Sequence, residues 1–118
     1  MIKLVFFLAA AAALAAMLYH VKGFMNPTPL RPAWRHAVFV AVNTALFYGL
    51  LKRPDWFTWF FGLVTLQQLY SHGSSALAEW HTQHRVDWIS VLVITGMPLL
   101  FFLLLRERRR LRKKVPAN

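Results

Sequence analysis

The sequence predicts an all-α integral membrane protein, a bundle of four transmembrane helices with both termini in the cytoplasm. Of its 118 residues, 58% are hydrophobic and only 15% are charged. A soluble domain this small leaves too much of its surface in water to accommodate that composition. The apolar residues gather in four long segments without the alternation of strands, which favours helices over a β-barrel.

The four segments contain 18 to 20 residues each, and they cover about 2–21, 33–51, 55–72 and 88–105. A helix of that length crosses the ~30 Å hydrocarbon core of a bilayer. Only residues 52–54 separate the second segment from the third, so these two should be antiparallel neighbours. Together the segments predict a transmembrane domain over 1–105, followed by a basic cytoplasmic tail over 106–118.

The start of the chain is also consistent with a signal peptide. Lys3 forms a minimal basic region, and small residues follow around 12–16. However, the apolar run continues through Met17 and Leu18 without a polar region before a cleavage site, which favours a retained helix.

The distribution of positive charge predicts the orientation. With the C-terminus inside, ten of the 14 Lys and Arg residues lie on the inner side, and four lie outside. This bias places the termini in the cytoplasm, and we expect a bacterial inner membrane. By charge alone the tail could bind nucleic acid, but its position directly after a span favours anionic lipid head groups instead. The residues expected to contact head groups are Arg106, Arg108, Arg109, Arg110, Arg112, Lys113 and Lys114.

The same topology places all five histidines on the outer side. A short interfacial helix over 75–84, capped by Ser74 or Ser75, should carry two of them toward the bundle. Polar side chains within the spans should face the bundle interior, because an amide facing lipid is costly. Asn43 is expected to hydrogen-bond a neighbouring helix. The expected lining of an outward-opening polar pocket is Asn43, Thr65, Gln67, Gln68 and Tyr70.

Three kinds of ligand fit this outer cluster. Imidazoles and carboxylates could hold a transition metal. Two imidazoles at matching depth, such as His36 and His72, could instead clamp a b-type haem. A quinone-type molecule could bind beside the glutamines and His72. The candidate ligand or metal residues are His20, His36, His72, His81, His84, Glu79 and Asp87.

These observations predict a non-catalytic accessory, assembly or ligand-holding subunit. The chain has no cysteine, which excludes thiolate chemistry, and no catalytic residue is assigned. The alternatives are a metal- or haem-binding redox enzyme subunit and a protein that binds a lipophilic ligand. A bundle this small buries little surface, so we also expect a homo-oligomer or a subunit of a larger membrane complex.

Overall fold

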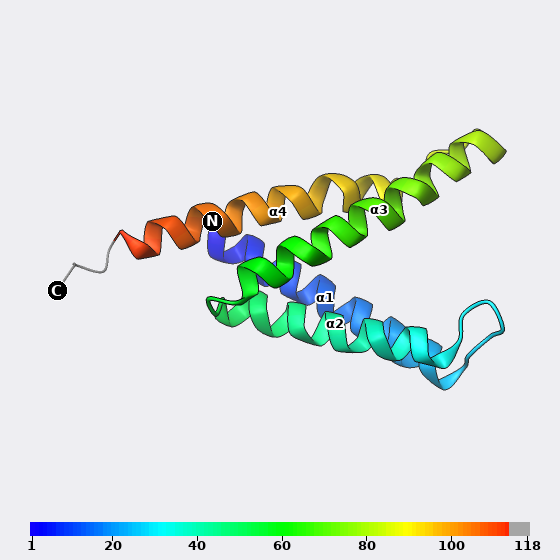
Figure 1. Cartoon of the computed structure of the whole chain (residues 1–118), viewed down its shortest axis with the longest axis horizontal. Helices are drawn as coiled ribbons and strands as arrows, with labels where there is room; N and C mark the ends of the chain where they lie inside the picture. The colour runs from blue at the N-terminus through cyan, green and yellow to red at the C-terminus, as the bar shows by residue number, and fades with distance from the viewer. Residues whose placement is uncertain (114–118) are drawn as a thin grey trace. The chain divides into compact units, whose positions relative to one another are not determined.

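The computed structural model describes residues 1–113, and it is all-helical, as predicted (Figure 1). Residues 1–113 contain no strand, and an isolated bridge joins Thr28 and Arg31 in the first connection. The chain divides into two compact units, Met1–Pro54 and Asp55–Asn118, and each is built on a helical hairpin. The helices are α1 (Ile2–Met25), α2 (Ala33–Lys52), α3 (Phe57–Gln83) and α4 (Trp88–Arg112).

Two of the helices, α1 and α4, are long and apolar enough to cross a membrane. Their most apolar windows of 18 residues have mean hydropathies of 2.2 and 2.4. The other two helices have the required length but carry more polar side chains, among them Arg35 and His36 in α2 and the glutamine pair in α3. Basic residues 106–112, expected to form a tail outside the helices, continue α4 instead.

Helix α3 differs most from the sequence-based expectation. A helix ending at 72 and a separate one over 75–84 were expected, but one helix of 27 residues runs from Phe57 to Gln83. Ser74 and Ser75 do not cap a new helix. Their hydroxyls donate to the carbonyls of Tyr70 (2.8 Å) and Ser71 (3.0 Å), four residues earlier, so they stay within the helical ladder. As a result, α3 runs on past the point where α4 begins (Figure 1).

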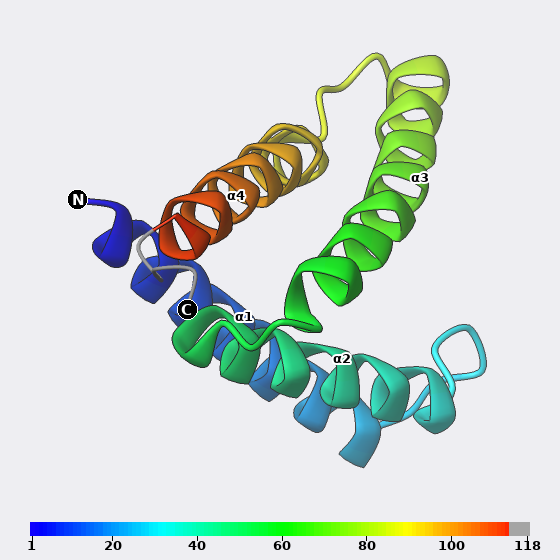
Figure 2. The same ribbon diagram turned by 60° about the vertical axis from the view of Figure 1, so that its left-hand side comes forward.

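In the first unit, α1 packs along α2 through small residues (Figure 2). Ala10 and Ala13 are buried in α1, and their small side chains let the helix backbones approach closely. At the other end of α2, the helix closes on Arg53, which adopts a left-handed conformation with φ of 53°. The Arg53 guanidinium lies 5.3 Å from the centre of the Phe6 ring, a cation–π contact that joins the two helix ends.

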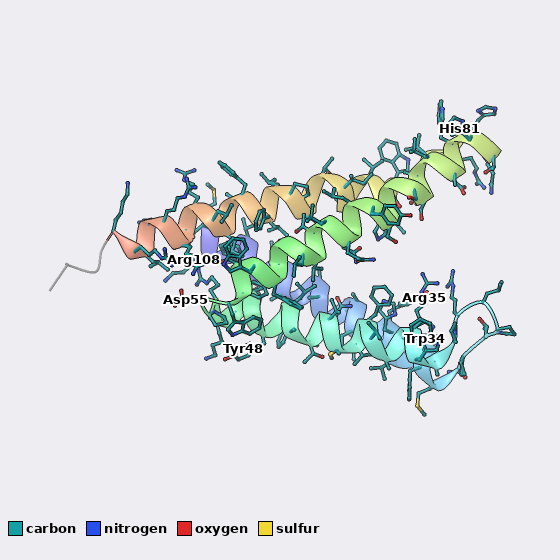
Figure 3. The ribbon with its side chains drawn as sticks, viewed as in Figure 1. Trp34, Arg35, Tyr48, Asp55, His81 and Arg108 are labelled. Carbon is teal, nitrogen blue, oxygen red and sulfur yellow. The ribbon has the colours of Figure 1, made fainter. Side chains whose placement is uncertain are left out.

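In the second unit, phenylalanines fill the space between α3 and α4. Phe57 and Phe61 are fully buried, and Phe61 stacks on Phe101 with ring centres 6.4 Å apart. Asp55, which precedes α3, and Arg108, near the end of α4, form an ion pair of 3.4 Å (Figure 3). Because the Asp55 side chain is 91% exposed, this pair contributes little to stability.

We predict that Phe61→Ala lowers the free energy of unfolding by about 3 kcal/mol, because it empties a filled site between α3 and α4. Trp59→Ala is the control, since Trp59 is 77% exposed. Reversible unfolding in mixed micelles, followed by circular dichroism, measures both. Equal losses for the two variants would contradict this packing.

Candidate functional site

In the first unit, His20 of α1 and His36 of α2 meet directly. Their Nδ1 atoms lie 3.0 Å apart, and their ring centres lie 5.3 Å apart. The difference is close to twice the distance from an imidazole centre to its own nitrogen, so both nitrogens lie near the line joining the ring centres. This is the geometry of one N–H···N hydrogen bond, in which one ring donates and the other accepts. The two nitrogens therefore face each other rather than a common third point.

The surroundings of this imidazole pair hold it within its own hairpin. His36 is buried, with 6% of its surface exposed, and Gly23 of α1 lies against its ring. A Cβ atom at residue 23 would overlap that ring, so only glycine leaves room for it. On the other side, the His20 ring stacks on Phe39 with centres 4.8 Å apart. His36 is thus a packed residue of the α1–α2 interface.

In the second unit, His72 of α3 is linked to the start of α4 through Ser90. The His72 Nδ1 atom lies 2.9 Å from Ser90 Oγ, which in turn lies 2.5 Å from Asp87 Oδ2. The Ser90 backbone N–H donates to Asp87 Oδ1 at 3.1 Å, so Asp87 also caps α4. Ser90 is 1% exposed. We call this chain of contacts the Asp87–Ser90–His72 relay.

The relay also sets the ionisation of its carboxylate. The Ser90 hydroxyl and, secondarily, the Ser90 backbone N–H hold the pKa of Asp87 below its ordinary value. Asp87 is therefore the ionised, acceptor-only end of the relay at neutral pH.

The remaining histidines lie apart from these contacts. His81 is exposed near the end of α3 (Figure 3), and His84 ends the helix in a left-handed conformation with φ of 50°. Glu79 is half-buried on the same stretch. Within each unit, as far as residues 1–113 are described, no three His, Asp or Glu side chains lie close enough to hold a metal ion. The metal site and the b-type haem between His36 and His72 stay predictions.

The expected lining residues divide into two groups. Asn43 and Thr65 are buried, but each donates to a carbonyl of its own helix at 2.8 Å, that of Phe39 and that of Phe61 respectively. Within the first unit, Asn43 therefore bonds to its own helix and not to α1, and a bond from Asn43 to a helix of the second unit stays a prediction.

The second group lies on the surface of α3. Gln67 and Tyr70 are exposed, and Gln68 is half-buried. Gln68 Nε2 donates to Gln67 Oε1 at 2.9 Å, so the amide pair satisfies part of its hydrogen bonding internally. That these residues line a polar pocket stays a prediction.

The basic residues at the end of α4 are mostly exposed, in keeping with a surface role. Arg106, Arg109, Arg110, Arg112 and Lys113 are exposed, whereas Arg108 is half-buried beside Asp55. Lys114 lies outside the described residues. Their contact with lipid head groups stays a prediction.

Three residues of these contacts were missed by the sequence-based prediction. Ser90 follows Asp87 by three residues, which is the spacing of a helix cap and its acceptor, and that signal could have found it. Gly23 follows His20 by three residues, on the same helix face. Thr44 Oγ1 of α2 lies 3.2 Å from Met17 Sδ of α1, and no sequence pattern marks that contact.

No family model, no curated protein and no solved structure matches this chain. What the protein does must therefore be inferred from its own residues.

We predict that Gly23→Ala destabilises the α1–α2 hairpin, because the added Cβ pushes the His36 ring out of its position. Gly73→Ala is the matched control: it also replaces a helical glycine, but its Cβ meets nothing within 4 Å. The control should gain about 0.5–1 kcal/mol from better helix propensity. Thermal unfolding in detergent compares the two variants, and a stabilised Gly23→Ala protein would refute the close contact.

A second prediction concerns acid. Because the folded-state pKa of Asp87 is lowered, its hydrogen bonds stabilise the fold above the ordinary aspartate pKa, and this stability is lost as the pH falls through the lowered value. Asp87→Asn should lack this part of the acid dependence. Unfolding measured between neutral pH and pH 2 for both proteins tests it, and identical pH profiles would contradict it.

Proposed function

We propose that the chain is a polytopic protein of the bacterial inner membrane in which all four helices span the bilayer. In this arrangement both termini lie in the cytoplasm, and the protein is a non-catalytic accessory, assembly or ligand-holding subunit. The observation that carries the proposal is the exposed apolar face of α3. This helix also carries polar residues, which lower its mean hydropathy.

This face consists of Trp59, Leu63, Leu66 and Tyr70, which are 65% to 80% exposed. They follow one another by four, three and four residues, so they form one stripe along the helix. The buried residues Phe57, Phe61 and Thr65 lie on the opposite side. A continuous stripe of large apolar side chains is costly in water, and it suits contact with lipid.

Lipid offers polar side chains no hydrogen-bond partner, so those within a span must bond inside the protein. The hydroxyls of Thr44, Thr65 and Thr95 each donate to the carbonyl four residues earlier at 2.8 Å. The Asn43 amide does the same. With 20 residues, α2 is about 30 Å long, which is the thickness of the hydrocarbon core.

The ligand-holding role follows from where the polar contacts lie along each hairpin. The His20–His36 contact lies near the 26–32 connection, and the Asp87–Ser90–His72 relay lies near the 84–87 connection. If all four helices span, both connections face the outside. Residues 52–53 and the basic end of α4 then face the cytoplasm, where positive charge is preferred. The exposed arginines of α4 would contact anionic head groups there. The protein would form a complex with other copies of itself or with other membrane proteins.

Single cysteines in this cysteine-free chain test the topology. We expect Leu30→Cys and Val86→Cys to react with a membrane-impermeant maleimide from outside intact spheroplasts, because both are exposed in the hairpin connections. Asp55→Cys should react only from inside, in inverted vesicles. Reaction of Leu30→Cys and Val86→Cys from opposite sides, or of all three from one side, would refute four spans.

A further inference from the structure

The Asp87–Ser90–His72 relay determines which nitrogen of His72 carries a proton. An ionised carboxylate only accepts, so Ser90 gives its single hydroxyl hydrogen to Asp87 across the 2.5 Å contact. Ser90 Oγ must then accept from His72 Nδ1 at 2.9 Å. This assignment follows from the hydrogen-bond network, and in the neutral ring it leaves a lone pair on Nε2.

The free nitrogen is reachable from outside the helical hairpin. His72 is half-buried, and among the described residues its Nε2 atom makes no hydrogen bond. This atom is also accessible, because His72 Nε2 is not among the buried, unpartnered side-chain atoms of residues 1–113. The atom of that kind is Arg108 Nε. His72 Nε2 therefore presents an acceptor at the surface of its unit.

A second acceptor lies one helical turn away. Gln68 precedes His72 by four residues, so both lie on the same face of α3. Its Nε2 atom donates to Gln67 Oε1, which leaves Gln68 Oε1 free to accept. Two acceptors and no third metal-ligating group within reach suit a molecule that donates hydrogen bonds rather than a metal ion.

We propose that His72 Nε2 and Gln68 Oε1 accept hydrogen bonds from hydroxyl groups of a lipophilic molecule that resides in the membrane. This proposal rests on the proposed function, because it needs α3 to lie in a bilayer. Two sources supply that chemistry, a quinol and the glycerol head group of phosphatidylglycerol.

The first experiment determines the tautomer. Nitrogen-15 NMR of histidine-labelled protein in phosphatidylcholine nanodiscs distinguishes a protonated ring nitrogen from one with a lone pair. We expect Nδ1–H in the wild type. In Asp87→Asn the new amide can donate to Ser90, which turns the Ser90 hydroxyl toward His72 and moves the proton to Nε2. Glu79→Gln, a carboxylate outside the relay, is the matched control and should keep Nδ1–H. An Nε2–H wild type overturns the proposal.

The second experiment adds the probes. A decyl-chain benzoquinol is titrated into the nanodiscs, and in a parallel sample phosphatidylglycerol replaces part of the phosphatidylcholine. We expect one of the two to shift the His72 Nε2 signal, which identifies the source. The affinity should fall about tenfold for each hydrogen bond removed. Asp87→Asn should lose binding, and Glu79→Gln should keep it.

Gln68→Leu leaves the relay and the α4 cap intact, so it tests the second acceptor without risk to the fold. It should also weaken binding about tenfold. A wild-type signal that neither probe shifts, or equal binding by the Gln68→Leu and wild-type proteins, overturns the proposal. Failure of the proposed topology would appear separately, in the maleimide labelling, while the tautomer assignment would still hold.

Discussion

Each hairpin of this protein depends on an imidazole that bonds across to the other helix near the connecting loop. A buried polar group is costly unless it finds a partner, so these contacts can form only in one register of the two helices. In the first hairpin, His20 supplies the partner of buried His36. In the second, Ser90 supplies the partner of His72 and passes the contact to Asp87. Most of the side chains buried elsewhere in the two hairpins are apolar, and they fix the register less strictly.

In both contacts an imidazole Nδ1 atom makes a hydrogen bond to the other helix, but the two differ in what surrounds them. The His20–His36 contact joins two like groups through their Nδ1 atoms, and Gly23 lies against the His36 ring. The Asp87–Ser90–His72 relay joins three unlike groups and ends on an atom open to its surroundings. The first is a structural contact, whereas the second is the one that a ligand can reach.

The sequence predicts the helical class, the four segments and the grouping of histidines at the loop ends, because apolar length and charge bias are properties of the chain itself. It does not reveal that α3 continues past residue 72. Ser74 and Ser75 are equally suited to capping a helix or to bonding back within one, and the choice depends on the surrounding helix. Nor does it show that His36 is turned to His20, since helical periodicity fixes a face and not the partner on the next helix.

The overshoot of α3 past the start of α4 constrains the connection between them. Gln83 lies eleven residues beyond His72, about 16 Å along the helix axis, while Ser90 is held beside His72. The chain must return most of that distance between Gln83 and Trp88, and five extended residue steps span at most about 17 Å. The connection is therefore almost fully stretched. Its length, more than its composition, keeps Asp87 and Ser90 level with His72, so the loss of one residue from 84–86 would draw the relay apart without altering any of its members.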